Sequence, residues 1–184
     1  MKKKYSFSLA MATPAFLTRA AIIAALYTVL TIMASGFGLA SGAIQVRFSE
    51  AMVVLTYFTP AAVPGLTIGC LISNIITGCV MMDIIFGTLA TFLGVVAGYA
   101  LRKNRWLVSI PPIITNALII PFVLSYAYHI PGGIPYFVLT VGAGEVISCL
   151  ILGQALLSAL LPFRKYLFGE PNESVGEAVS RRDV

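Results

Sequence analysis

The stretch that decides the fold reads QVRFSEA at positions 45–51 and lies between two long apolar runs. Arg47 is the only Lys or Arg among residues 20–101. Glu50 follows it by three residues, and Gln45 precedes it by two. Charged groups in such apolar surroundings normally face protein or water and serve a function. The stretch therefore predicts the outer mouth of a membrane-embedded site for a small polar molecule.

The composition is that of a membrane protein. Of the 184 residues, 59% are hydrophobic and only 10% are charged, and the mean hydropathy is +0.95. A soluble domain carries about a quarter charged residues. The apolar residues come in blocks of roughly twenty, the length of a helix that crosses a bilayer. The sequence predicts one all-α integral membrane domain, and it lacks the short alternating strands of a transmembrane barrel.

Six transmembrane spans are predicted, at residues 17–36, 47–58, 61–82, 83–101, 106–128 and 136–161. We expect Pro111 and Pro112 to kink or delay the regular part of the fifth span. The chain then divides into a cytoplasmic or interfacial segment (1–16), a six-helix transmembrane substrate-binding domain (17–163) and a polar cytoplasmic tail (164–184).

The basic residues orient these spans. With six spans both termini lie on one side, and that side receives every Lys and Arg of the 12 except Arg47. Cytoplasmic loops are enriched in Lys and Arg. The distribution predicts a multi-pass protein of the cell membrane with both termini in the cytoplasm.

The polar residues of the predicted spans gather toward the outer side, and we take seven as candidate substrate-binding residues: Gln45, Arg47, Glu50, Asn74, Asp83, Asn116 and Glu145. Glu145 lies near mid-membrane, where a carboxylate costs about 2.5–3.5 kcal/mol. A protonated Glu145 that forms a hydrogen bond between helices is the alternative.

Structural interpretations of the other polar residues also remain open. Asn116 is equally suited to a helix–helix contact. Asp83 fits the N-terminal cap of the fourth helix. Arg47 and Glu50, three residues apart, are spaced for a pair on one helix face. His129 lies in an outer turn and fits a solvent-facing position.

Small residues recur at helical spacing in three spans, and small residues let helices approach closely in lipid. For the glycine pairs Gly65/Gly69 and Gly94/Gly98 we prefer internal packing. The first span carries two overlapping small-xxx-small patterns that suit either internal packing or a partner subunit: Ala20, Ala21, Ala24 and Ala25.

Motifs for catalysis are absent from the sequence. It holds no GxSxG, HExxH or Walker motif. Cys70, Cys79 and Cys149 lack CxxC spacing and are interpreted as packing residues. We expect no enzyme activity, no metal site and no cofactor. Active transport would need an ion gradient or a separate ATPase.

Three motifs carry a resemblance to a known family. QVRFSEA at 45–51, Gly69-x-x-x-x-Asn74 and DIIFGTLAT at 83–91 are similar to the QueT family, over about residues 17–161. That family comprises substrate-binding S components of energy-coupling factor (ECF) transporters for queuosine precursors. The resemblance implies a six-helix S-component bundle in which the loop after the first helix acts as a lid over the ligand.

The resemblance also implies a ligand and partners. The ligand would be queuine or 7-aminomethyl-7-deazaguanine, with a carboxylate taking the donors of its guanine-like edge and Asp83 suited to its ammonium. Phe86 and Tyr126, with Tyr128 and Tyr136, are candidates to stack on the ring. The partners would be a transmembrane T component, docked on the alanine face, and two ATPases.

Three other functions remain open at this stage. The first is an S component for another vitamin. The second is a small stand-alone permease or channel, which would transport by itself. The third is an intramembrane enzyme, for which the sequence offers no nucleophile–base pair.

Overall fold

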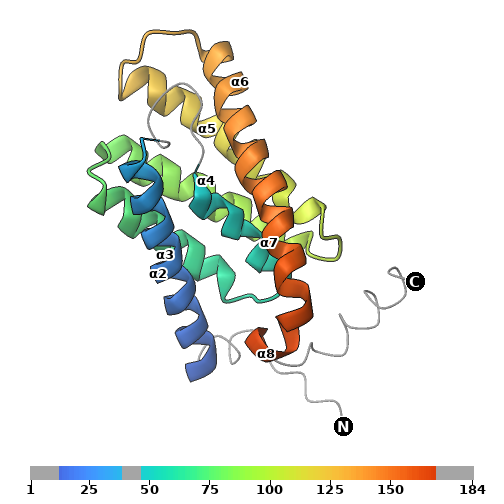
Figure 1. Ribbon diagram of the computed structural model, residues 1–184. Coiled ribbons are helices and arrows are strands. Elements are labelled where there is room, and N and C mark those ends of the chain that lie inside the picture. The colour runs from blue at the N-terminus through green and yellow to red at the C-terminus, as the bar shows by residue number, and fades with distance from the viewer. Residues whose placement is uncertain (1–12, 39–46, 169–184) are drawn as a thin grey trace.

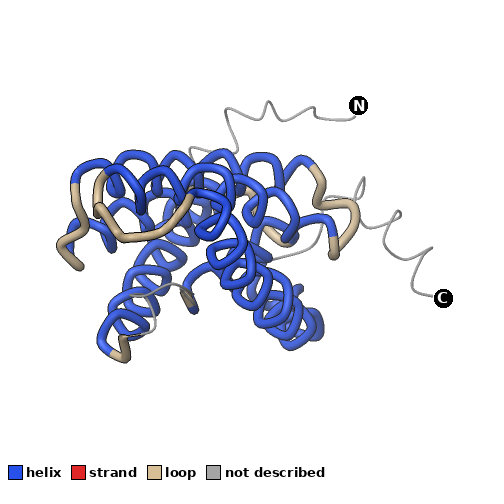
Figure 2. The backbone as a smooth tube through the Cα atoms, turned by 90° about the horizontal axis from the view of Figure 1, so that it is seen from above, coloured by secondary structure: helices blue, strands red, loops and turns tan. Residues whose placement is uncertain are grey.

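The computed structural model describes residues 13–38 and 47–168, and all regular elements in these ranges are helical (Figures 1 and 2). In chain order they are α2 (Pro14–Gly36), η1 (Phe48–Tyr57), α3 (Ala62–Ile76), α4 (Met81–Ala100), η2 (Leu107–Ser109), α5 (Ile110–Tyr126), α6 (Ile134–Glu145), η3 (Val146–Leu152), α7 (Gly153–Leu160), η4 (Leu161–Phe163) and α8 (Arg164–Phe168).

Four of these helical segments are long and apolar enough to cross a membrane: Pro14–Gly36, Met81–Ala100, Leu107–Tyr126 and Ile134–Phe168. They correspond to the first, fourth, fifth and sixth predicted spans. The second and third correspond to η1 and α3, apolar helices of 10 and 15 residues. At about 2.0 Å per residue for a 3-10 helix and 1.5 Å for an α-helix, each is shorter than a hydrocarbon core of about 30 Å.

The first helix begins where its sequence allows a cap. The Thr13 hydroxyl accepts a hydrogen bond from the Phe16 backbone N–H at 3.3 Å, and Pro14 occupies the first helical position. Proline is tolerated there because that N–H has no partner within the helix. The helix ends at Gly36, as predicted, and starts three residues before the predicted position.

The prediction that the third span reaches residue 82 is wrong. α3 ends at Ile76, and Gly78 follows with a φ of +73°. The Cys79 N–H donates to the Asn74 carbonyl at 3.0 Å, and the Gly78 N–H donates to the Ile75 carbonyl at 3.2 Å. This pair of bonds is a Schellman motif, in which a glycine takes the left-handed conformation that ends a helix. α4 accordingly starts at Met81 instead of Asp83.

The fifth and sixth predicted spans are interrupted helices. The 3-10 turn η2 precedes α5, in agreement with the delay expected from Pro111 and Pro112. The sixth span consists of α6, the π-helical segment η3 and α7, which form one long column with α8 below it (Figure 1). α8 extends helical structure into residues 164–168, which the sequence assigned to the polar tail.

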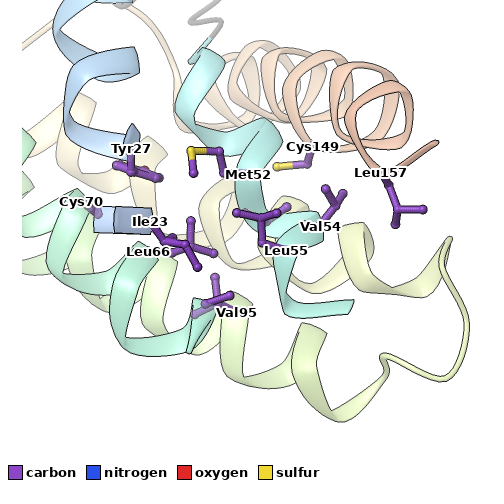
Figure 3. Close-up of a cluster of buried hydrophobic side chains, with 12 residues drawn as sticks. Ile23, Tyr27, Met52, Val54, Leu55, Leu66, Cys70, Val95, Cys149 and Leu157 are labelled. Atoms are coloured by element: carbon purple, nitrogen blue, oxygen red, sulfur yellow. The ribbon is translucent and has the colours of Figure 1, made fainter. Parts of the chain in front are cut away.

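The central element of the bundle is η1. Residues 49–56 are all buried, and η1 packs against α2, α3, α4, η3 and α7. An element that is apolar all round is stable only when neighbours cover every side. Figure 3 shows Met52, Val54 and Leu55 of η1 among side chains from α2, α3 and α7. The polar residues at the start of η1 are therefore also held inside the protein.

Glycines set the spacing between the helices around η1. A Cβ at Gly69 would lie 2.8 Å from the Tyr27 Cβ and 2.9 Å from the Ala24 carbonyl oxygen. A Cβ at Gly94 would lie 2.7 Å from the Pro112 Cα. Cβ atoms in proteins do not approach other atoms this closely. The close contacts of α2 with α3, and of α4 with α5, therefore require glycine at positions 69 and 94. Internal packing of the two glycine pairs is thus confirmed.

We expect Gly69→Ala to destabilise the bundle by about 1–3 kcal/mol, the usual effect of overpacking a tight contact. The added methyl group would push α2 away from α3. Thermal unfolding of the purified protein in detergent measures the effect as a lower midpoint than that of the wild type.

Gly142→Ala is the matched control on α6. Its added Cβ would meet nothing closer than the Ala117 Cβ at 3.8 Å, an ordinary contact. It should unfold at or above the wild-type midpoint, since alanine favours a helix. Equal midpoints for the two variants would contradict the tight α2–α3 contact.

Candidate functional site

Two buried glutamates from distant parts of the chain meet at the centre of the bundle. Glu50 comes from the first turn of η1, and Glu145 is the last residue of α6. One oxygen of each carboxylate and the Cys149 Sγ all lie within 4.8 Å of one another. The exposed fractions are 1% for Glu50 and 7% for Glu145, so both carboxylates are withdrawn from solvent. Carboxylates this close repel when both are ionised, and the pair therefore needs a proton, a donor or a cation.

Glu50 is oriented by a tyrosine of α2. The Tyr27 hydroxyl donates to Glu50 Oε1 at 2.5 Å, and Tyr27 is 1% exposed. Buried tyrosine hydroxyls normally find such a partner. Within the described part of the chain, Glu50 Oε2 has no hydrogen-bond partner although it is buried. Among the described residues, one acceptor of Glu50 is therefore left without a donor.

Glu145 lies where α6 changes into the π-helical segment. The Cys149 thiol, one turn further on in η3, donates to Glu145 Oε2 at 3.1 Å. Figure 3 shows the Cys149 side chain beside η1. The buried Asn116 of α5 lies next to the Glu145 carboxylate. π-helical segments often occur at functional sites, and this one begins directly after Glu145.

Arg47 supplies positive charge to these acids. Arg47 is half-buried and directly precedes η1 in the chain. It interacts electrostatically with Glu50, Asp83 and Glu145. Its backbone N–H donates to the Ser148 hydroxyl at 3.2 Å, which joins the start of η1 to η3. In a low dielectric such charge interactions are much stronger than in water.

A third buried carboxylate, Asp83, lies in the first turn of α4. Its Oδ2 accepts from the Tyr128 hydroxyl at 2.9 Å, whereas Oδ1 is buried with no partner among the described residues. Val80, and not Asp83, is the N-cap residue of α4, so the N-cap interpretation is wrong, although Asp83 does lie in the first turn, where a negative charge is favourable.

Gly87 and Asn74 lie close to the Asp83 carboxylate. A Cβ built on Gly87 would lie 3.1 Å from Asp83 Oδ1 and 3.3 Å from Asn74 Nδ2. Asn74 also approaches the Cys70 Sγ at 3.7 Å. Asp83 and Asn74 thus face the same spot on α4, from which a side chain is missing.

The structure brings six of the predicted binding residues into this region: Arg47, Glu50, Asn74, Asp83, Asn116 and Glu145. Gln45 lies outside the described residues. Phe86, Tyr126 and Tyr136 are 38%, 63% and 50% exposed, and their contact with a ligand stays a prediction. His129 lies in the turn between α5 and α6 with a φ of 50°.

The alanines of α2 divide into two faces. Ala20 and Ala24 are buried, and their carbonyl oxygens pack against Gly65 and Gly69 of α3. Ala21 and Ala25 are exposed. Of the four predicted docking residues, the structure therefore leaves only these last two open to a partner.

Three contacts were not predicted from the sequence. They are the bond from Tyr27 to Glu50, the bond from Cys149 to Glu145, and the bond from Tyr128 to Asp83. Two signals were available in the sequence. A tyrosine in the middle of a membrane helix needs a partner for its hydroxyl, and Cys149 follows Glu145 by four residues, which places both on one helix face. Nothing in the sequence pointed to Gly87.

The chemistry of the region is that of hydrogen-bond acceptance. The carboxylates Glu50, Asp83 and Glu145 offer acceptors, and Arg47 and Asn116 offer donors. Glu50, Glu145 and Cys149 are spaced to hold a metal ion, for which three protein ligands would leave one position open. The same acceptors also suit a small molecule with several N–H groups.

Comparison with known proteins agrees with the resemblance of the motifs. A model of the QueT transporter family matches residues 17–162, which is most of the chain. The queuosine precursor transporter QueT of Lactococcus lactis subsp. cremoris (strain MG1363) is 37% identical over 73 residues. That match covers 40% of this chain and 43% of the relative. No solved structure matches the chain. The chain, a multi-pass membrane protein, belongs to the QueT transporter family.

Proposed function

We propose that this protein is the substrate-binding S component of an ECF-type importer and captures a queuosine precursor from outside the cell. The observation that carries the proposal is the meeting of Glu50 and Glu145, two buried carboxylates with an open acceptor, inside a helical membrane protein. Membership of the QueT transporter family supports it, as does the name of the Lactococcus relative.

The ligand class follows from the acceptors. A deazaguanine presents a ring N–H and an amino group side by side, and a carboxylate accepts both as a bidentate pair. In the proposal Glu145 or Glu50 takes this pair, while Arg47 or Asn116 donates to the carbonyl of the base. Queuine and 7-aminomethyl-7-deazaguanine share this edge. Stacking of the exposed Phe86 and Tyr126 on the ring stays a prediction.

Six crossings with both termini in the cytoplasm complete the proposal. The basic residues support this orientation, since Arg47 alone would face outward. Figure 1 also shows the start of α2 and the short helix α8 at one end of the molecule, with the α5–α6 turn at the other. The energy for uptake would come from two ATPases, coupled through a T component that docks on Ala21 and Ala25.

We expect mass spectrometry to detect a deazaguanine retained on the purified protein.

Glu145→Gln should weaken binding of 7-aminomethyl-7-deazaguanine by more than tenfold, because losing a charged acceptor typically costs about 1.5–3 kcal/mol. Isothermal titration measures the change. Tyr126→Phe alters an exposed ring and should bind as the wild type does. Unchanged affinity in Glu145→Gln would remove Glu145 from the site, and retention of a different vitamin would replace the proposed substrate.

The docking proposal predicts that Ala25→Leu abolishes assembly with the T component and the ATPases and leaves ligand binding intact. A leucine would prevent close approach of a partner helix. Co-purification of the complex measures assembly. Ala155→Leu, at an exposed position of α7, is the control that should still assemble. If Ala25→Leu also assembles, α2 is not the docking face. Uptake by this chain alone in liposomes would instead favour a stand-alone permease.

The proposed orientation is tested by labelling from outside intact cells with an impermeant thiol reagent. A cysteine at position 45 should react, and one at position 103 should react only after the membrane is opened. The control is labelling of both after detergent is added. The reverse pattern would show that the termini lie outside.

A further inference from the structure

A short basic turn joins α4 to η2 and α5. Residues 101–106 connect two helical segments that are long and apolar enough to cross a membrane, Met81–Ala100 and Leu107–Tyr126. A turn between two such segments lies at a membrane surface. Three of its six residues are basic, Arg102, Lys103 and Arg105, and none of them belongs to the candidate functional site.

The positive charges of this turn have no acid to pair with in the part of the chain that the structure describes. Lys103 and Arg105 are exposed, and Arg102 is half-buried. The acids of the described residues are all buried, and none of them forms an ion pair with the turn: Glu50, Asp83 and Glu145. The turn is therefore open to an anion from outside the described chain.

Both arginines of the turn lie against aromatic rings. Arg102 Cζ is 4.0 Å from the centre of the Tyr99 ring, and Arg105 Cζ is 5.1 Å from the centre of the Trp106 ring. These contacts hold the guanidinium groups in place before a ligand arrives, which lowers the entropy cost of binding. A guanidinium group binds the oxygens of a phosphate as a bidentate pair.

The backbone of the turn is held from inside the protein. Gln154 of α7, which is 7% exposed, donates from Nε2 to the Arg105 carbonyl at 2.8 Å and to Ser109 Oγ at 3.3 Å. The Trp106 N–H donates to Asn104 Oδ1 at 3.0 Å. The three basic side chains therefore project from a turn whose conformation is set by a buried amide.

The side chains next to the cations match the apolar part of a lipid. Leu101, Trp106 and Leu107 are 42%, 51% and 42% exposed. Tryptophan is enriched where a membrane meets water. A soluble anion or an acidic peptide would pair with the cations and leave these apolar side chains uncovered. A phospholipid matches both, because its phosphate and its acyl chains are joined in one molecule.

We propose that the turn of residues 101–106 is a binding site for the headgroup of an anionic phospholipid. Arg102 and Arg105 bind the phosphate, Lys103 adds positive charge, and the acyl chains lie on the exposed apolar side chains. Basic segments next to membrane helices attract anionic lipids. This site is separate from the buried glutamates, so the inference does not depend on the proposed function.

The test is native mass spectrometry of the purified full-length protein in detergent. The probes are dioleoylphosphatidylglycerol and dioleoylphosphatidylcholine, which have the same acyl chains and differ in headgroup charge. The wild type should bind the first phosphatidylglycerol molecule at least about tenfold more tightly, since each basic residue near an anionic headgroup contributes roughly a factor of five. The double variant Arg102→Gln with Arg105→Gln should reduce this preference to less than about threefold.

Two further variants separate a built site from net charge. Arg164→Gln with Lys165→Gln removes the same charge from α8 and should keep the wild-type preference. Gln154→Leu keeps every charge but releases the turn, and it should lower the preference. Millimolar glycerol 3-phosphate, the soluble headgroup fragment, should not displace the lipid.

The opposite results would overturn the inference. An unchanged preference in the Arg102 and Arg105 variant would exclude the turn as the site. An equal loss in the α8 variant would show that net charge alone attracts the lipid. Displacement by glycerol 3-phosphate would show a site for a free anion instead of a lipid. Should Gln154→Leu fail to fold, the two arginine and lysine variants still decide the question.

Discussion

The hydrogen bond from Tyr27 to Glu50 is the interaction on which the candidate site depends. A carboxylate buried in an apolar bundle is tolerated only with hydrogen-bond partners. Tyr27 supplies one at 2.5 Å and joins α2 to the central element η1. A second bond between the same elements, from the Thr31 hydroxyl to that of Ser49 at 2.8 Å, holds the start of η1 in place. The acid is thereby fixed, and its second oxygen has no partner among the described residues.

The small residues of the bundle make this bond possible. Gly69 lets α3 approach the backbone of α2 at Ala24 and Tyr27, and Thr28 donates to the Gly69 carbonyl at 3.3 Å. The close α2–α3 contact holds the Tyr27 side chain toward η1. Membrane helices gain little from burying apolar surface against one another, so close packing and polar contacts hold them together. The residues that pack the helices here also position the site.

Much of the helical layout could be predicted, and the failures have local causes. The first span was confirmed as a helix, and residues 17–36 contain no proline and no glycine before Gly36. The third failed at Gly78, because hydropathy does not report a backbone that turns with positive φ. Within the site, Glu145 was chosen as a costly charge near mid-membrane, and Asp83 as a polar residue toward the outer side. Tyr27 was overlooked because tyrosine is amphipathic, and its environment depends on which face of the helix is covered.

The sequence by itself determined that the chain is helical and apolar, how its basic residues are distributed, and the motifs of its family. These properties depend on residues that lie close together in the sequence, so they can be recognised along the chain without knowledge of its fold. Only the tertiary structure decided which polar groups meet. Glu50 and Glu145 lie far apart in the sequence, and they come together because η1 is buried against the column of α6, η3 and α7. Packing of the helices also buried Ala24 and left Ala25 exposed, because a neighbouring helix covers only one face of α2.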